Sequence, residues 1–145
     1  MKPQFLVTIH VKKPIAEVFD AVVNPDKLKV YFICTSTGPL VKGATVMWQF
    51  ADHPGEFPVK VIDLVPNSSI ELQWNGDDES YMTTIDMKFE AVKEGVTKVA
   101  ISETGWNEND AAIKSSYRNC GGWMHMACCM KAYLEFGINL RTGSF

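Results

Sequence analysis

The sequence has no long hydrophobic segment and no cluster of basic residues. No stretch approaches the roughly 20 apolar residues that a membrane-spanning helix requires. The N-terminus has neither an apolar run of signal-peptide length nor a small-residue cleavage site. The net charge is -3, and no Lys/Arg-rich stripe is present to bind nucleic acid or an anionic membrane. We therefore expect a cytoplasmic protein without membrane insertion or nucleic-acid binding.

Motifs for catalysis and metal binding are also missing. There is no G-x-S-x-G sequence, no Gly-rich phosphate loop and no C-x-x-C pair. The three histidines lie too far apart for a metal-ligand pattern: His10, His53 and His125. We predict no metal site and no cofactor. The four cysteines are interpreted as reduced, mostly buried thiols, although Cys128 could line a cavity: Cys34, Cys120, Cys128 and Cys129.

Length and composition predict one globular domain over residues 1–145. The chain has 145 residues, of which 46% are hydrophobic and 21% charged, as in ordinary globular proteins. A chain of this length buries roughly two-thirds of its unfolded surface when it folds. A substantial core is therefore expected, and no internal repeat or linker divides the sequence.

The last third of the chain predicts one long helix, from about Asp110 to Leu140. One apolar stripe recurs at helical spacing: Trp123, Met126, Ala127, Met130, Leu134 and Ile138. Charged and polar residues fall opposite it and predict a solvated face: Arg118, His125, Lys131, Glu135 and Arg141. Asn107, Asn109 or Asp110 can cap the start, and Gly143 suits the chain leaving the helix.

Gly121 and Gly122 interrupt this helical pattern. Each glycine costs about 1 kcal/mol relative to alanine in a helix interior. Three interpretations follow: the helix begins near Asn119, it continues with a kink, or the missing side chains let a ligand or a strand approach the backbone.

Most of the chain before this helix has the alternation of β-strands. We predict strands at 4–11, 36–40, 44–50, 57–65, 70–74, 81–91 and 96–104, with a turn at 53–55. Two short helices, at 14–23 and 25–32, follow the first strand. Short turns between consecutive strands favour an antiparallel meander. The predicted class is α+β, with the long helix packed against a curved sheet.

Several segments resemble the helix-grip fold of the START/SRPBCC and pollen-allergen-like superfamily. KPIAEVFDAVVNPDKLKVYF resembles its strand exit and helix pair, and LVKGATVMWQF and FPVKVIDLVPNSSIELQW resemble its central strands. SETGW and GGWMHMACCMKAYLEFG resemble the subgroup related to the activator of heat-shock-protein-90 ATPase. The resemblance implies a cavity between the sheet and the last helix. The final helix of this chain is unusually rich in sulfur-containing residues compared with the family. The ligand preference of the family therefore cannot be assigned to this chain.

Strand parity and the helix stripe predict which residues line that cavity. On the sheet they are Trp48, Phe50, Trp74, Tyr81, Met87 and Phe89, and on the helix Trp123, Met126, Ala127 and Met130. Tyr31 and Phe32 are candidates for its mouth, and Ser115, Ser116 and Tyr117 for its rim. The alternative is that these residues simply pack in a core.

Glu103 is the candidate for chemistry. It shares strand parity with the inward residues Val99 and Ile101, where a carboxylate needs hydrogen bonds and its pKa tends upward. It could bind a ligand hydroxyl or amine or act as an acid or base. Alternatively it reaches solvent at the strand end. Asp63 has the same ambiguity and a weaker case.

Three functions are compatible with these features. The first is a protein that binds a hydrophobic or aromatic small molecule, such as a lipid or a polyketide-like metabolite. The second is a cyclase, aromatase or hydrolase that uses the cavity carboxylate, although no catalytic constellation is evident. The third is a chaperone ATPase co-activator, ranked last because that role also involves another domain, for which 145 residues leave no room. A homodimer is possible in each case.

Overall fold

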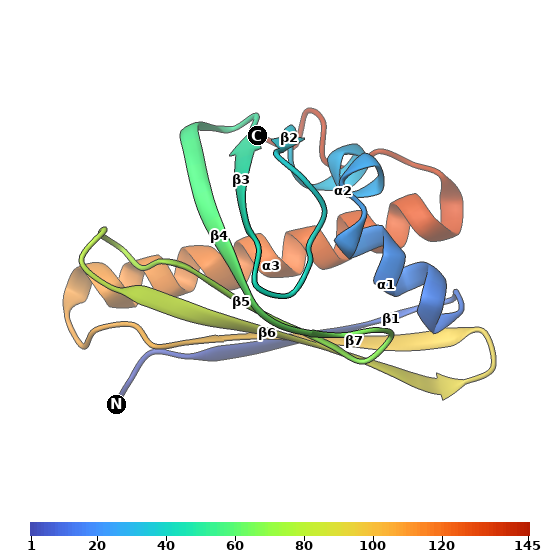
Figure 1. Cartoon of the computed structure of the whole chain (residues 1–145), viewed down its shortest axis with the longest axis horizontal. Coiled ribbons are helices and arrows are strands. Elements are labelled where there is room, and N and C mark those ends of the chain that lie inside the picture. The colour runs from blue at the N-terminus through green and yellow to red at the C-terminus, as the bar shows by residue number, and fades with distance from the viewer.

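The computed structural model describes all 145 residues and has the predicted α+β fold. Its elements in chain order are β1 (Phe5–Val11), α1 (Ile15–Val23), α2 (Pro25–Tyr31), β2 (Thr35–Ser36), β3 (Thr45–Phe50), β4 (His53–Val65), β5 (Ser69–Asn75), β6 (Met82–Lys93), β7 (Val96–Thr104) and α3 (Asp110–Phe136). The seven strands form one antiparallel sheet in the order β1-β7-β6-β5-β4-β3-β2. Figure 1 shows α3 running along the sheet, with α1 and α2 beside it.

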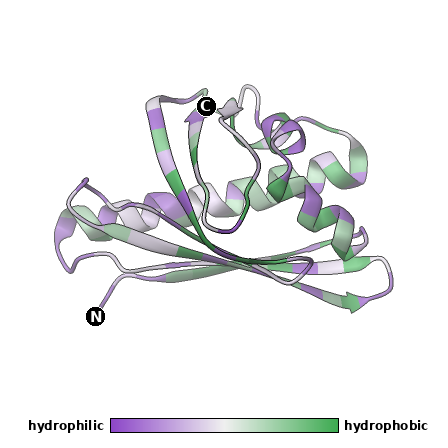
Figure 2. Ribbon diagram, viewed as in Figure 1, coloured by the Kyte–Doolittle hydropathy of each residue, from purple (hydrophilic) through white to green (hydrophobic).

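One face of the sheet forms the core together with the helices. In β6 every second residue from Thr83 to Phe89 is buried, which confirms the predicted parity of this strand. Figure 2 shows the corresponding alternation of hydropathy along β4. The core continues into α3 through Trp123, Met126 and Met130. None of the three helices combines the length and the apolar character that a membrane-spanning helix requires.

Helix α3 begins as predicted and ends earlier. The side chain of Asn109 accepts a hydrogen bond from Ala112 N at 2.9 Å and caps the start. The helix is continuous through Gly121 and Gly122, so the interpretation of a start near Asn119 is wrong. Gly137, with φ 66°, ends it in the left-handed conformation that glycine favours, so the predicted end near Leu140 is wrong.

The predicted solvated face of α3 is wrong at its C-terminal end. Lys131 Nζ donates to His10 O at 2.6 Å, and Glu135 Oε2 accepts from Lys12 N at 2.9 Å. The two side chains also pair with each other at 2.6 Å. They anchor α3 to the outermost strand, β1, which holds the helix in place along the sheet.

Two predictions for the hairpin strands need correction. The predicted strand 36–40 is only the two-residue β2, because Gly38 and Pro39 follow and proline cannot donate to a strand ladder. The predicted turn at 53–55 already belongs to β4, since the register shifts between Gln49 and Phe50 and pairs Phe50 with His53. The turn therefore lies at residues 51–52, and this shift brings His53 to the end of the hairpin.

The expectation of mostly buried thiols is wrong. Cys129 is buried, Cys34 is exposed, and Cys120 and Cys128 are half-buried. All four are free thiols in the structure.

Candidate functional site

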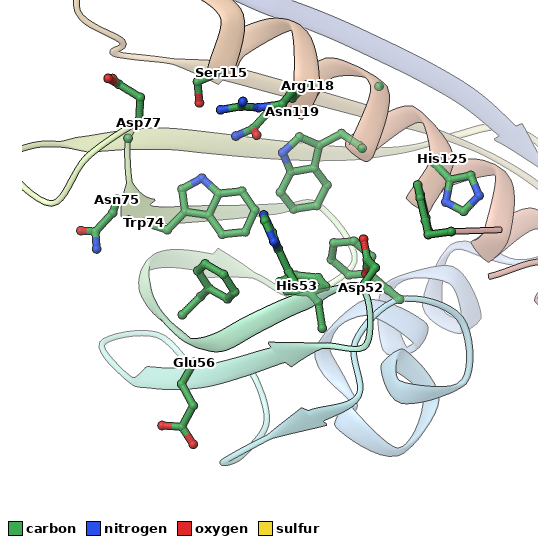
Figure 3. A pocket seen from close by; sticks show the side chains of 18 of the residues that line it. Asp52, His53, Glu56, Trp74, Asn75, Asp77, Ser115, Arg118, Asn119 and His125 are labelled. Carbon is green, nitrogen blue, oxygen red and sulfur yellow. The ribbon is translucent and has the colours of Figure 1, made fainter. Parts of the chain in front are cut away.

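A large pocket lies between the β3–β4 hairpin, the end of β5 and helix α3. Its volume is about 1240 Å³, above the range of roughly 300–1000 Å³ that is usual for small-molecule sites. In Figure 3, His53 and Trp74 reach the pocket from the sheet, and Ser115, Arg118 and Asn119 reach it from α3. Of its 21 lining residues, 6 are hydrophobic. The hydrophobic contribution consists of aromatic rings: Phe32, Phe50, Phe57, Trp74, Trp123 and Phe145.

Five of these rings, all except Phe145, form a continuous aromatic surface. Trp74 of β5 and Trp123 of α3 meet with ring centroids 5.4 Å apart at an angle of 32°. Phe32 lies 5.5 Å from Trp123 and 5.1 Å from Phe50. Phe50 in turn lies 5.7 Å from Phe57. Rings at these separations attract one another. Phe50, Phe57 and Trp74 are half-buried, and their accessible ring surface offers stacking positions for another planar group.

Glu103 lies fully buried beneath this surface, and four side chains bind its carboxylate. Trp123 Nε1 donates to Oε1 at 3.0 Å, and Trp74 Nε1 donates to Oε2 at 2.9 Å. Thr83 Oγ1 donates to Oε2 at 2.6 Å. Asn119 Nδ2 donates to Oε1 at 3.1 Å and to Oε2 at 3.2 Å. The carboxylate thus ties the two tryptophans of the pocket to one point.

Secondary-structure periodicity brings these groups together. Glu103 pairs with Ile85 across β6–β7, and Trp74 pairs with Thr83 across β5–β6, so their side chains share the inner face of the sheet. Asn119 and Trp123 are four residues apart on α3 and therefore lie on one face of the helix. The predicted inward orientation of Glu103 is confirmed, and the alternative of a solvent-exposed Glu at the strand end is wrong.

Burial raises the pKa of Glu103 above its usual value of 4.5, and the hydrogen bonds from Thr83, Trp74, Asn119 and Trp123 act in the opposite direction. The indole N–H groups can only donate, so they favour the ionised carboxylate. The structure shows no cation paired with this carboxylate. Its charge is therefore stabilised by dipoles, an arrangement that suits a positioning role.

The segment after α3 returns to form one wall of the pocket. Arg141 Nη2 pairs with Asp52 at 2.7 Å, and its guanidinium lies 4.8 Å from the ring centroid of Phe145 and 5.7 Å from that of Phe32. Arg141 Nη1 also lies 3.3 Å from His125 Nδ1. Burial and the adjacent Arg141 lower the pKa of His125, while Asp52 acts in the opposite direction. The predicted solvated positions of His125 and Arg141 need correction, because His125 is half-buried and the Arg141 side chain is only 15% exposed.

The pocket includes some of the predicted site residues and not others. Phe50, Trp74 and Trp123 line it, as do Phe32 and Ser115 among the secondary candidates. Others are buried or half-buried in the structure but do not line it: Trp48, Tyr81, Met87, Phe89, Met126 and Met130, together with Tyr31, Ala127, Ser116 and Cys128. Tyr81 instead hydrogen-bonds Asp77 at the rim, Tyr31 donates to Ala21 O at 3.0 Å, and Tyr117 is exposed on α3. Asp63 pairs with Lys42 at 3.2 Å, away from the pocket.

Most of the pocket's polar wall was not predicted from the sequence. It comes from four places. The β3–β4 hairpin contributes Asp52, His53 and Glu56, and the end of β5 with the loop after it contributes Asn75, Asp77 and Glu79. Helix α3 contributes Arg118, Asn119 and His125, and the C-terminal segment contributes Arg141. The spacing of Ser115, Asn119 and Gly122 on one helical face was a signal that could have found the α3 contribution.

Comparison with protein families places the chain. The sequence model of the Activator of Hsp90 ATPase homolog 1-like protein family matches residues 12–135. The chain belongs to this family. No functionally curated protein matches it.

Solved structures share the fold of this Activator of Hsp90 ATPase homolog 1-like chain. SSP2350 from Staphylococcus saprophyticus is 24% identical with a TM-score of 0.80, covering 95% of this chain and 96% of that one. The Aha1 dimer from Colwellia psychrerythraea is 27% identical with a TM-score of 0.77, covering 92% and 97%. DynU16, described as a putative protein in the dynemicin biosynthetic locus, is 18% identical with a TM-score of 0.83, covering 97% and 50%.

Proposed function

We propose that this protein binds a planar aromatic small molecule, of polyketide-like character, in the pocket between the sheet and α3. The observation that carries the proposal is the aromatic surface of Phe50, Phe57, Trp74 and Trp123 within a pocket of about 1240 Å³. Stacking on such rings favours a flat conjugated ligand over a flexible acyl chain. The polar rim supplies hydrogen bonds that orient ring substituents.

The charges around the rim also favour a polar aromatic ligand over a lipid. Four carboxylates and two guanidinium groups line the pocket: Asp52, Glu56, Asp77, Glu79, Arg118 and Arg141. Asp52 and Arg141 pair with each other. A hydrocarbon chain laid among the other four charges would desolvate them without pairing them, which is costly. A hydroxylated ring system can hydrogen-bond the same groups. The place of DynU16 in a biosynthetic locus is compatible with a small-molecule role for this fold.

The hydrogen bonding of the Glu103 carboxylate favours this proposal over acid–base catalysis. Both carboxylate oxygens already accept at least two hydrogen bonds from protein donors, and Glu103 does not line the pocket. A general acid or base has to reach the reacting group of the substrate. We assign Glu103 the role of positioning Trp74 and Trp123, and unchanged turnover in Glu103→Gln would exclude it from any enzymatic reaction.

Emodin, a hydroxylated anthraquinone, tests the proposal against oleate as a lipid probe. Isothermal titration calorimetry should show one emodin per chain and no competition by oleate. Phe57→Leu should weaken emodin binding by about 2- to 10-fold, since an aromatic contact contributes about 0.5–1.5 kcal/mol. Phe136→Leu, the same change at an exposed residue outside the pocket, should leave affinity unchanged. Displacement by oleate, or equal effects of both variants, would contradict the proposal.

Two further attributes are proposals of the same kind. The four free thiols are compatible with a reducing compartment, so we place the protein in the cytoplasm. The Colwellia psychrerythraea protein is described as a dimer, and a homodimer is proposed here by analogy. Light scattering during gel filtration tests the dimer, and a monomeric mass at all concentrations would refute it.

A further inference from the structure

The Ser115 hydroxyl is a buried polar group without a partner in the protein. The residue lies in α3 and is only 6% exposed, yet its Oγ makes no hydrogen bond to any other residue. Its neighbour Ser116 is 4% exposed and is satisfied, because Ser116 Oγ donates to Ile113 O at 2.7 Å. Buried hydroxyls are normally hydrogen-bonded, since an unpaired one costs free energy. The open position at Ser115 therefore points to a missing partner.

The pocket is where that partner can lie. Ser115 is one of the lining residues, and Figure 3 shows it on α3 beside Arg118 and Asn119. Its Oγ is not sealed inside the core, because the only fully enclosed side-chain nitrogen and oxygen atoms without a hydrogen bond are Nε1 of Trp48 and Nε1 of Trp106. The hydroxyl thus opens into the pocket, where a ligand group can accept its hydrogen bond.

Arg118 lies one helical turn beyond Ser115 and supplies a free charge. Residues three apart on a helix are neighbours, and both side chains line the pocket. Arg141, the other guanidinium of the pocket, pairs with Asp52 at 2.7 Å. Arg118 forms no salt bridge. A guanidinium and a hydroxyl therefore face the same part of the pocket, and this pair of donors suits an anionic oxygen acceptor.

The carboxylates of the loop after β5 limit this acceptor to a single negative charge. Asp77 and Glu79 line the pocket from this loop, and neither pairs with Arg118. Asp77 instead accepts a hydrogen bond from Tyr81 OH. Because like charges repel, two carboxylates beside one guanidinium disfavour a dianion such as a phosphate monoester. A carboxylate with one negative charge pairs with Arg118 at less repulsion.

We propose that Ser115 and Arg118 form a subsite for a carboxylate substituent of the ligand, which makes the ligand an aromatic carboxylic acid. This inference rests on the proposed aromatic-binding function and specifies its ligand class. The Arg118 guanidinium donates to the carboxylate through two parallel N–H groups, and Ser115 Oγ donates to one of its oxygens. The attached ring system stacks on the accessible rings of Phe57 and Trp74.

Emodic acid, which carries a carboxyl group in place of the emodin methyl group, is the matched probe. Isothermal titration calorimetry should show that the wild type binds emodic acid at least about tenfold more tightly than emodin. Arg118→Gln should abolish this preference, and Ser115→Ala should reduce it by about 2- to 10-fold. Lys114→Gln removes the same charge at an exposed position of α3 outside the pocket, and Ser116→Ala removes a hydroxyl that does not line it. Both controls should keep the preference of the wild type.

The ratio of the two affinities separates this inference from the function beneath it. Equal binding of emodin and emodic acid by the wild type would overturn the carboxylate subsite alone. Equal loss of the preference in Arg118→Gln and Lys114→Gln would assign it to the overall charge of the protein, which also overturns the subsite. Binding of neither probe by the wild type would overturn the proposed function and the subsite with it.

Discussion

Replacement of Glu103 by glutamine should destabilise the protein by removing an acceptor from a buried network. The carboxylate accepts from Trp74 and Thr83 at one oxygen and from Trp123 at the other, with Asn119 bridging both. In the variant, an NH₂ group replaces one of these oxygens. Asn119 can rotate its amide to accept from that group, whereas an indole N–H can only donate.

The magnitude follows from the donor that loses its partner. If the glutamine oxygen serves Trp74 and Thr83, the Trp123 N–H is left buried without an acceptor, at a cost of about 1–3 kcal/mol. With a urea slope of about 2 kcal/mol per M, a loss of about 2 kcal/mol lowers the unfolding midpoint by about 1 M. Urea titration followed by tryptophan fluorescence measures this shift. Glu90→Gln, at an exposed position of β6, is the matched control and should change stability by less than about 0.5 kcal/mol.

The pH dependence of the free energy of unfolding provides a second test of the Glu103 site. Because burial raises the folded-state pKa of Glu103 above 4.5, the folded protein binds this proton more tightly than the unfolded chain. The contribution of Glu103 to stability is therefore fully present below pH 4.5 and declines as the pH rises through the folded-state pKa. The wild type should exceed Glu103→Gln by more at about pH 5 than at about pH 8. A stability difference between the two proteins that is constant or grows with pH would refute the dominance of burial over the hydrogen bonds to Glu103. An unchanged urea midpoint in Glu103→Gln would refute the stabilising role of the hydrogen-bond network.

Two further predictions concern the C-terminal wall of the pocket. Arg141→Met should lower the free energy of unfolding by about 1–2 kcal/mol in urea titration, because the side chains of Arg141 and Asp52 are only 15% and 30% exposed. Lys27→Met breaks the more exposed pair with Asp20 and should cost less than about 0.5 kcal/mol. Equal losses in the two variants would contradict a special role for the wall. The folded-state pKa of His125 lies below 6.5, so the contribution of His125 to stability is present above pH 6.5 and is lost as the pH falls through the folded-state pKa. Thermal unfolding of His125→Gln at several pH values should not show this loss of stability. A pH profile parallel to that of the wild type would exclude His125 as the source of the loss.

Residue periodicity predicted the framework of the site because period two and period 3.6 determine which side chains share a face. It correctly oriented Glu103 inward, and Trp123 within the apolar stripe of α3. It could not show that Thr83 and Asn119 converge on the same carboxylate, since that depends on how the helix sits over the sheet. The hydrogen bonds join residues 16 to 29 positions apart.

The polar wall was beyond reach of the sequence for different reasons. His53 enters the pocket because of a register shift in the β3–β4 hairpin, which no hydropathy pattern encodes. Arg141 reaches it through an ion pair with a residue 89 positions away. Gly137 and Gly143 both adopt a positive φ, and a glycine at either position suits the end of a helix. The sequence therefore did not identify which of the two ends α3.

The tryptophan side chains offer the most direct test of the central claim that the pocket binds a planar aromatic molecule. The chain has four tryptophans, of which Trp74 and Trp123 line the pocket and Trp48 and Trp106 do not. In a ¹⁵N-labelled sample each indole N–H gives its own NMR signal, which can be followed during titration with emodin. The account predicts that the signals of Trp74 and Trp123 shift with saturation while that of Trp106 stays in place. A shift of Trp106 with Trp74 and Trp123 unmoved would contradict it.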